Sequence, residues 1–221
     1  MTATTPKLIC FPPAALNGGP LDTAPPKVGQ WAWQPKIDDR RVVIHVPSRT
    51  IWNQYGQLSV AQDSQKFEGA LDALQRESDN SSSLEWLDCG LMEYRNDMMR
   101  GCIVIFDMII PEIPFDLRRG MLQTAVFHSA QMGVLPPDMD TMLLNCGRVI
   151  RDEVFLINQW PNGANKIDSY NALKAQNERI GRKFFEGVVA KKMDSPYLFG
   201  QVPKQVTCNW VKHRFDQIGG A

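Results

Sequence analysis

The sequence predicts an α+β fold in which mainly antiparallel sheets are flanked by helices. Runs rich in aromatic and β-branched residues, which are typical of strands, are interspersed with runs in which apolar residues recur at helical spacing. These runs do not follow the regular β-α-β order that builds a parallel sheet. The sequence has no glycine-rich phosphate-binding loop, so nothing in it supports a Walker or Rossmann nucleotide-binding domain.

Six segments have the composition of strands. The first two, residues 31–36 and 42–46, flank a polar turn of two aspartates and two arginines. The strongly apolar residues 102–110 predict a strand buried on both faces. The remaining expected strands cover residues 84–87, 187–191 and 210–215.

Three segments are expected to be helical. In residues 63–77, the apolar side chains from Phe67 to Leu74 recur at helical spacing and predict an amphipathic helix. The other two expected helices cover residues 117–131 and 167–180.

The chain is expected to form one domain preceded by an arm. With 221 residues, 43% of them apolar, it is long enough to bury a core. Residues 1–30 are rich in proline and glycine, which disfavour a helix and predict an extended N-terminal arm. The composition changes at Trp31, so residues 31–221 are expected to form the domain.

Charge is balanced overall but not along the chain. The 24 Lys and Arg residues equal the 24 Asp and Glu residues, so net charge gives no general attraction to nucleic acid or anionic membranes. Residues 179–214, however, hold eight basic residues and two acidic ones. A polyanion is therefore expected to meet this C-terminal part first.

The cysteines and the hydropathy indicate a cytoplasmic protein. The five cysteines are widely spaced and include no Cys-x-x-Cys pair, so they are expected to be reduced thiols and not zinc ligands. The N-terminus has no signal-peptide pattern, and no run reaches the roughly 18 apolar residues that span a membrane. No membrane partner is expected.

The first segment that carries chemistry is the turn at residues 36–41. It places the amine of Lys36, the carboxylate of Asp38 and the guanidinium of Arg41 around one turn at the end of a strand. Taken alone, such a mixture is usually a solvated loop, so the segment needs support from elsewhere in the chain.

Two later segments complete a pattern. Residues 185–197 read Phe-Glu-Gly-Val-Val-Ala-Lys-Lys-Met-Asp-Ser-Pro-Tyr, and residues 210–214 read Trp-Val-Lys-His-Arg. Together with residues 36–41, they resemble the Lys-x-Asp-Gly-x-Arg, Glu-Gly-Val-Val-x-Lys and Trp-x-Lys-x-Lys/Arg motifs of the covalent nucleotidyltransferase superfamily, and within it the ATP-dependent DNA ligases. The resemblance spans residues 31–215. It implies a nucleotidyltransferase (ATP-grasp-like) domain in which Lys36 takes AMP from ATP.

The resemblance implies a role for residues in each motif. Gln34 is expected at the adenine edge and Phe106 on the face of the purine. The residues expected to act in catalysis are Lys36, Asp38, Arg41, Glu186, Lys191 and Lys212. Those expected to contact ATP are Gln34, Lys36, Phe106, Glu186, Lys191, Lys212 and Arg214. Mg²⁺ or Mn²⁺ is expected on Glu186 and Asp38, and nucleic acid on Arg41, Lys192, Lys204 and Arg214.

Elementary chemistry is consistent with these roles. A lysine with its ordinary pKa of about 10.4 is protonated at neutral pH and is not nucleophilic. Nearby cations lower that pKa, and Lys191, Lys212 and Arg214 supply them if the late strands pack beside Lys36. The same cations would hold the α-phosphate of ATP during displacement. Mg²⁺ bridging to phosphate normally takes only one or two protein carboxylates.

The sequence departs from the ligase pattern at three positions. Asp39 takes the place of the glycine in the first motif, and Gln54 takes the place of an arginine that contacts phosphate. Gly90 stands where ligases have a glutamate. The resemblance connects these positions with metal handling and ribose contact.

Ligases also continue past the last motif into an oligonucleotide-binding barrel. The seven residues that follow Arg214 leave no room for its five strands. The expectation is a monomeric minimal catalytic domain, or a protein whose missing clamp is supplied by a partner protein.

The function favoured by the resemblance is the sealing of nicks in duplex DNA through a lysyl-AMP intermediate, with ATP and not NAD⁺ as the adenylate donor. The joining of RNA or RNA-containing duplexes is an alternative, because RNA ligases share the lysine chemistry. A catalytically weakened nucleic-acid-binding protein is the second alternative, and Asp39, Gln54 and Gly90 are the residues that favour it.

Overall fold

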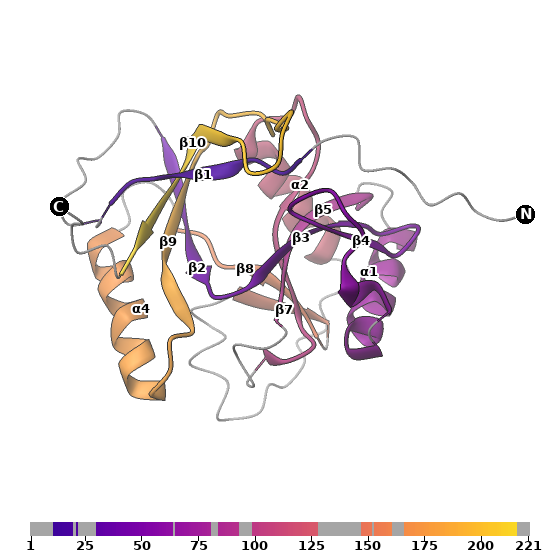
Figure 1. Ribbon diagram of the computed structural model, residues 1–221, viewed down its shortest axis with the longest axis horizontal. Helices are drawn as coiled ribbons and strands as arrows, with labels where there is room; N and C mark the ends of the chain where they lie inside the picture. Colours follow the sequence, from indigo (N-terminus) through magenta and orange to yellow (C-terminus); the bar gives the residue numbers. More distant parts are fainter. Residues whose placement is uncertain are drawn as a thin grey trace, which may run out of the picture.

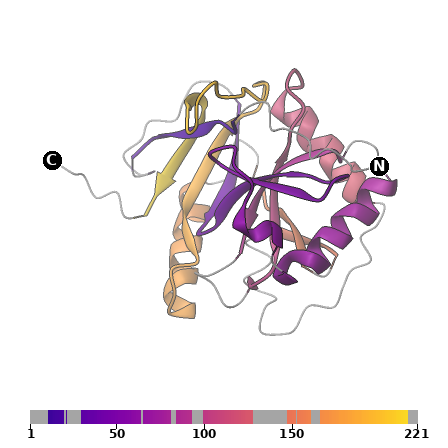
Figure 2. The same cartoon turned by 45° about the vertical axis from the view of Figure 1, so that its right-hand side comes forward.

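The structure, a computed structural model, describes residues 11–19, 21, 30–63, 65–80, 84–92, 99–127, 147–151, 153–160 and 166–215. These residues form two sheets that lie side by side, with helices packed against them (Figures 1 and 2). The expected α+β class is confirmed.

The small sheet brings together strands from both ends of the chain. Its order is β1 (Ala14–Asn17), β10 (Val206–Arg214), β9 (Phe185–Lys192) and β2 (Trp31–Ile37). The β10–β9 and β9–β2 pairs are antiparallel, whereas β1 runs parallel to β10.

Glycine is required where β9 approaches β10. Gly187 has a φ of +143°, and a β-carbon on this residue would lie 1.9 Å from the backbone oxygen of His213. An L-residue with a side chain can neither adopt this backbone easily nor fit in this space. The glycine of the Glu-Gly-Val-Val motif therefore sets the close pairing of the two strands.

Strand β1 comes from the segment expected to be an arm. Residues 11–19 follow the edge of the small sheet, and Ala14–Asn17 pair with β10. The arm is thus partly built into the sheet. Residues 1–10, 20 and 22–29 lie outside the described residues.

The large sheet has six strands. Its order is β4 (Thr50–Asn53), β3 (Arg40–His45), β5 (Trp86–Leu91), β6 (Ile103–Met108), β8 (Val154–Ile157) and β7 (Gly147–Arg151). Neighbouring strands are antiparallel except for β6 and β8. Strands β4, β7 and β8 were not expected from the sequence, because runs of four or five residues are too short to show a clear period.

Strand β5 extends beyond the expected residues 84–87. Leu87, Cys89 and Leu91 point into the core beneath the large sheet, so Asp88 and Gly90 face the opposite side. The acidic residue and the glycine interrupt the apolar run, which is why the sequence indicated a shorter strand.

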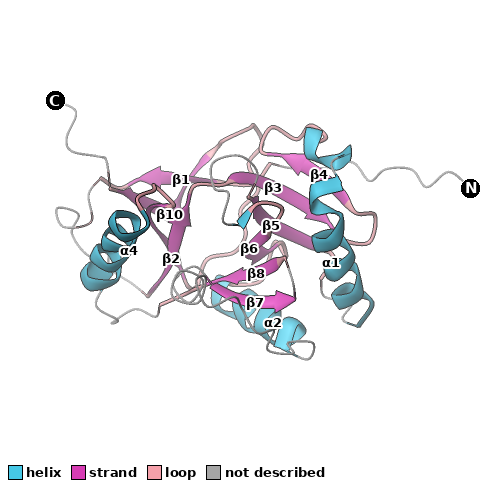
Figure 3. Cartoon of the chain, turned by 90° about the horizontal axis from the view of Figure 1, so that it is seen from below, coloured by secondary structure: helices cyan, strands magenta, loops and turns pink. Residues whose placement is uncertain are grey.

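All three expected helices are present. The helices α1 (Glu68–Asn80) and α2 (Phe115–Phe127) pack on the large sheet, and α4 (Lys166–Ile180) packs on β9 of the small sheet (Figure 3). Two 3₁₀ turns, η1 (Val60–Asp63) and η2 (Gln65–Phe67), precede α1, so this helix begins later than expected. Residues 128–131 of the second expected helix lie outside the described residues. None of the helices in the described ranges is long and apolar enough to cross a membrane.

The chain passes from the small sheet to the large sheet at the first motif. Strand β2 ends at Ile37, and β3 begins at Arg40, so Asp38 and Asp39 form the connection. A β-bulge between Lys36 and Ile37 shifts the register of β2 against β9. Bulges redirect side chains, and this one lies at the point where the two sheets meet.

Candidate nucleotide-binding site

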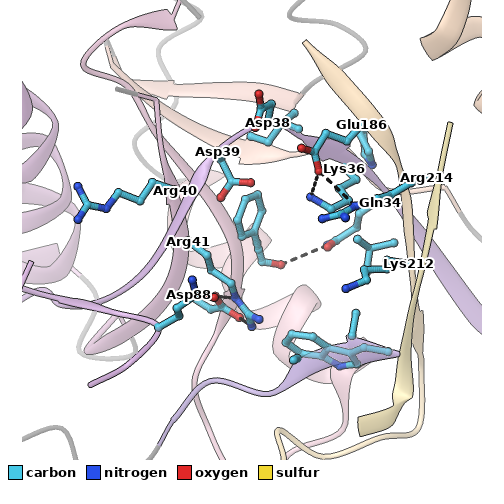
Figure 4. Close-up of a pocket in the computed structure, with 18 of the residues that line it drawn as sticks. Gln34, Lys36, Asp38, Asp39, Arg40, Arg41, Asp88, Glu186, Lys212 and Arg214 are labelled. Carbon is cyan, nitrogen blue, oxygen red and sulfur yellow. Dashed lines mark hydrogen bonds and ion pairs between the residues drawn. The ribbon is translucent and has the colours of Figure 1, made fainter. Parts of the chain in front are cut away.

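A pocket of about 570 Å³ lies between the two sheets. This volume is within the range typical of small-molecule sites. All nine residues expected to act in catalysis, to contact ATP or to hold its metal line it: Gln34, Lys36, Asp38, Arg41, Phe106, Glu186, Lys191, Lys212 and Arg214 (Figure 4). They come from strands that are distant in sequence but adjacent in the sheets.

Lys36 forms an ion pair with Glu186 in this pocket. The two side chains come from the paired strands β2 and β9, and the ammonium of Lys36 contacts Oε2 of Glu186. The same oxygen lies 3.5 Å from Nε of Arg214. Partial burial raises the pKa of Glu186, but the hydrogen bond and charge of Lys36 and the charge of Arg214 outweigh it, so the pKa is lowered. Glu186 is therefore a carboxylate at neutral pH.

Positive charge gathers on the small-sheet side of the pocket. Partial burial lowers the pKa of Lys212, and the nearby charges of Arg214 and Lys36 lower it further. Like charges this close together repel one another and disfavour the charged form of the lysine. A phosphate group entering the pocket would relieve this repulsion.

Asp38 and Glu186 could hold a metal together with a bound phosphate. Asp38 lies close enough to Glu186 to influence its pKa. Among the described residues no group of three or more His, Cys, Asp or Glu side chains could hold a metal ion. Two neighbouring carboxylates nevertheless fit Mg²⁺, which commonly takes one or two carboxylates and completes its shell with phosphate and water.

Arg41 is bound to Asp88 on the large-sheet side. Its Nε and Nη2 donate to Oδ1 and Oδ2 of Asp88 at 2.8 Å and 2.6 Å, and Nη1 donates to the carbonyl of Pro13. The hydroxyl of Tyr197 also donates to Asp88, at 3.0 Å. Burial alone would raise the pKa of Asp88 and lower that of Arg41, but the ion pair reverses both directions. The charge of Arg41 is thus compensated within the protein.

A buried network behind the pocket holds Lys191. Nζ of Lys191 lies 3.4 Å from Oδ2 of Asp107, and Asp107 accepts two hydrogen bonds of 3.0 Å from the fully buried Arg118. The ammonium also lies 4.2 Å from the centroid of the Trp210 ring. Burial lowers the pKa of Lys191 to about 8, and the charges of Asp107 and Asp88 offset only part of this effect.

Asp107 and Arg118 were not expected in the site from the sequence. Asp107 does carry a signal, because an acidic residue inside the apolar run of residues 102–110 must be paired when that run is buried. Its partner, eleven residues later on α2, could not be found from spacing alone.

Gln34 and Phe106 are joined through the backbone. Nε2 of Gln34 donates to the carbonyl oxygen of Phe106 at 3.2 Å, and Lys191 donates to the same oxygen at 3.2 Å. Both residues line the pocket, and Gln34 is buried. The side chain of Gln34 is therefore held at the backbone of Phe106.

The three departures from the ligase pattern all lie at or beside the pocket. Asp39 and Gln54 line it, and Gly90 lies directly against Asp39. Burial raises the pKa of Asp39 to about 7, against the opposing charges of Lys36 and Arg41.

The basic residues between 179 and 214 do not form one surface. Lys191, Lys212 and Arg214 line the pocket, whereas Lys192 and Lys204 do not. Lys192 pairs with Asp194 at 3.3 Å. Lys204, in the loop between β9 and β10, lies against the ring of Tyr55. The remaining basic residues, Arg179, Arg182 and Lys183, lie at the other end of β9, where α4 ends.

The fold of the chain is similar to that of solved DNA ligase structures. The ligase domain of M. tuberculosis LigD matches with a TM-score of 0.57 and 17% identity, over 93% of this chain and 59% of that chain. A mycobacterial DNA ligase D complexed with ATP and MES matches with a TM-score of 0.56 and 17% identity, over 93% and 60%.

A Chlorella virus DNA ligase-adenylate matches with a TM-score of 0.55 and 16% identity, over 94% of this chain and 68% of that chain. No protein-family model and no curated protein sequence matches the chain. The chain spans 59% of the length of the LigD ligase domain, so the likeness is one of fold over that part.

Proposed function

We propose that the chain is an ATP-dependent polynucleotide ligase and that Lys36 carries the AMP. The observation that supports this most directly is the convergence of an amine, its carboxylate partner and two further cations in one pocket. Glu186 forms ion pairs with both Lys36 and Arg214. The charges of these three residues also act on Lys212. Few arrangements other than the handling of a phosphate ester call for this set of charges.

In the first step, Nζ of Lys36 attacks the α-phosphorus of ATP. A nitrogen–phosphorus bond forms, the bond to the bridging oxygen of the β-phosphate breaks, and pyrophosphate leaves. Glu186 is the nearest base and takes the proton that the amine loses.

The cations on the small-sheet side have a second task. Lys191, Lys212 and Arg214 stabilise the charge that develops on the phosphate oxygens, without having to reorganise during the reaction. Mg²⁺, held by Asp38 and Glu186 with the bound phosphates, would add a further charge at the leaving group. Gln34 and Phe106 would orient the base, Gln34 at its edge and Phe106 on its face.

Two transfers would follow. AMP passes from Lys36 to the 5′-phosphate of a broken strand, and the 3′-hydroxyl then displaces AMP and closes the strand. Nicked duplex DNA is the first substrate to test, and an RNA-containing duplex is the second. The alternative function is that of a nucleic-acid-binding protein that does not take AMP.

Intact mass after incubation with ATP and Mg²⁺ tests the first step. Covalent AMP adds about 329 Da, and the Lys36→Ala variant should gain nothing. Lys36→Ala should still fold, because Glu186 keeps Arg214 as a partner when the lysine is removed. An adduct that persists in the variant would place the nucleophile elsewhere, and no adduct in either protein would favour the binding protein.

A further inference from the structure

Asp39 and Gly90 compete for the same space in the pocket wall. Arg41 pairs with Gly90 between β3 and β5, so residues 39, 41 and 90 face the same side. Oδ2 and Cβ of Asp39 lie 2.5 Å and 2.9 Å from the position that a β-carbon on residue 90 would take, and Cζ of Phe106 lies 2.7 Å from it. A side chain at residue 90 would displace both. Gly90 therefore makes room for the carboxylate of Asp39.

The carboxylate of Asp39 has an oxygen that the protein leaves available. Oδ2 is buried, and none of the described residues donates a hydrogen bond to it. Two other acidic side chains of the pocket differ, because Asp88 accepts hydrogen bonds from Arg41 and Glu186 forms an ion pair with Lys36. A buried carboxylate oxygen without a donor is unfavourable. A ligand that brings a donor to Asp39 would remove this penalty.

The two sides of the pocket carry side chains of opposite charge. Lys36, Lys212 and Arg214 lie on the small-sheet side, and Asp39 lies on the large-sheet side (Figure 4). Phosphates are drawn to the first side and repelled from the second. The part of a nucleotide that reaches Asp39 must then be uncharged and must carry hydrogen-bond donors, as the hydroxyls of a ribose do. The ring of Phe106 beside Asp39 supplies an apolar surface for the neighbouring base.

On the basis of the proposed function, we infer that the Asp39 carboxylate accepts a hydrogen bond from a ribose hydroxyl of the bound nucleotide, in the space that Gly90 leaves open. Asp39 is then a specificity-determining residue that selects ribonucleotides over deoxyribonucleotides. Two of the three departures from the ligase pattern form one unit: the residue added at position 39 fills the space vacated at position 90.

Equilibrium binding of ATP, 2′-deoxy-ATP and 3′-deoxy-ATP, measured by calorimetry in EDTA, tests this assignment. Without a divalent metal the lysine chemistry is suppressed, so binding alone is measured. Above pH 7, the value to which burial raises the pKa of Asp39, this side chain is a carboxylate. Under these conditions the wild-type protein should bind ATP roughly ten-fold tighter than at least one deoxy analogue, the size expected for a hydrogen bond to a charged group. Asp39→Ala should bind all three equally. Asp194→Asn, which removes an exposed carboxylate outside the pocket, should keep the preference.

The pairing of residues 39 and 90 has its own test. Gly90→Glu alone should lower the melting temperature and weaken binding of all three nucleotides, because two carboxylates would share one volume. The double variant Asp39→Gly/Gly90→Glu should recover both the melting temperature and the preference for ATP, since one carboxylate again occupies the space. A double variant no more stable than Gly90→Glu would overturn the pairing.

Other outcomes separate this assignment from the proposed chemistry. Three outcomes would overturn the role of Asp39. The preference for ATP could survive in Asp39→Ala, it could appear only with Mg²⁺, or ATP could fail to bind in EDTA. A preference that depends on Asp39 in a protein that never gains the mass of AMP supports the role of Asp39 and contradicts the ligase function. An AMP adduct with an unchanged preference in Asp39→Ala does the reverse.

Discussion

Arg41 on β3 and Asp88 on the neighbouring strand β5 are joined by two parallel hydrogen bonds of 2.8 Å and 2.6 Å. The carboxylate of Asp88 is fully buried, and the guanidinium lies 5.1 Å from the centroid of the Trp210 ring on β10. The pair therefore joins the large sheet to the small sheet at the base of the pocket. The arginine of the first motif has a structural role in addition to the expected contact with nucleic acid.

Asp88→Asn should destabilise the protein strongly. The change leaves the half-buried charge of Arg41 without its counter-ion, and breaking a buried pair from one side typically costs about 3–5 kcal/mol. The free energy of unfolding in urea measures this effect. Asp194→Asn is the matched control, because it breaks the exposed pair with Lys192 and should cost less than about 1 kcal/mol. Equal losses in the two variants would show that the Arg41–Asp88 pair does not anchor the sheets.

ATP affinity should fall as the pH rises through 8. In the free protein the pKa of Lys191 is about 8, so its ammonium is present at pH 7 and mostly lost at pH 9. Only the protonated form attracts phosphate, and the dissociation constant in EDTA should therefore rise up to about ten-fold between pH 7 and pH 9.

Lys191→Met isolates the contribution of this lysine. The variant keeps most of the aliphatic stem and leaves Asp107 paired with Arg118. Its affinity for ATP should be lower than that of the wild type at pH 7 and should change little up to pH 9. An affinity of the variant that falls as steeply as that of the wild type would assign the titration to another group.

Two glycines should respond in opposite directions to the same substitution. In Gly187→Ala the new β-carbon meets the backbone oxygen of His213 at 1.9 Å and the positive φ is strained, so β9 and β10 must separate at a cost of at least about 3 kcal/mol. Gly120→Ala places its β-carbon in open space on α2 and should stabilise the protein by about 0.5–1 kcal/mol. Thermal unfolding of both variants measures the difference. A Gly187→Ala protein as stable as the wild type would mean that the two strands are not paired this closely.

The residues of the pocket could be predicted from the sequence because its motifs fall on neighbouring strands. Lys36 is on β2, Glu186 and Lys191 are on β9, and Lys212 is on β10, and these three strands are adjacent in the small sheet. The resemblance of these motifs to those of ligases thus indicated a single site. The chemical roles of these residues remain predictions.

Contacts across the sheets could not be predicted in the same way. The bonds from Arg41 and Tyr197 to Asp88 depend on strand register and on the bulge that follows Asp88 in β5. A shift of one residue would turn Asp88 and Gly90 toward the core. The sequence showed that Asp39 and Gly90 were unusual, but only the register of β3 against β5 shows that they touch.

The two ends of the basic segment, residues 179–214, should differ in their effect on nucleic-acid binding. Lys204 lies beyond the C-terminal end of β9 and Arg179 lies before its N-terminal end, about 25 Å away along an eight-residue strand. A duplex that contacts Lys192 and Lys204 would leave Arg179 free of phosphate. Lys204→Gln should then weaken the binding of nicked duplex and make the slope of log K against log salt shallower by about 0.9, the value for one lost phosphate contact. Arg179→Gln removes the same charge from the other end and should leave the slope unchanged.

Fluorescence anisotropy with labelled nicked DNA between low and physiological salt gives both slopes. Self-adenylation of Lys204→Gln should be normal, because Lys204 lies outside the pocket. If Arg179→Gln changes the slope and Lys204→Gln does not, the nucleic acid lies at the α4 end of the small sheet and the expected contact with Lys204 is wrong.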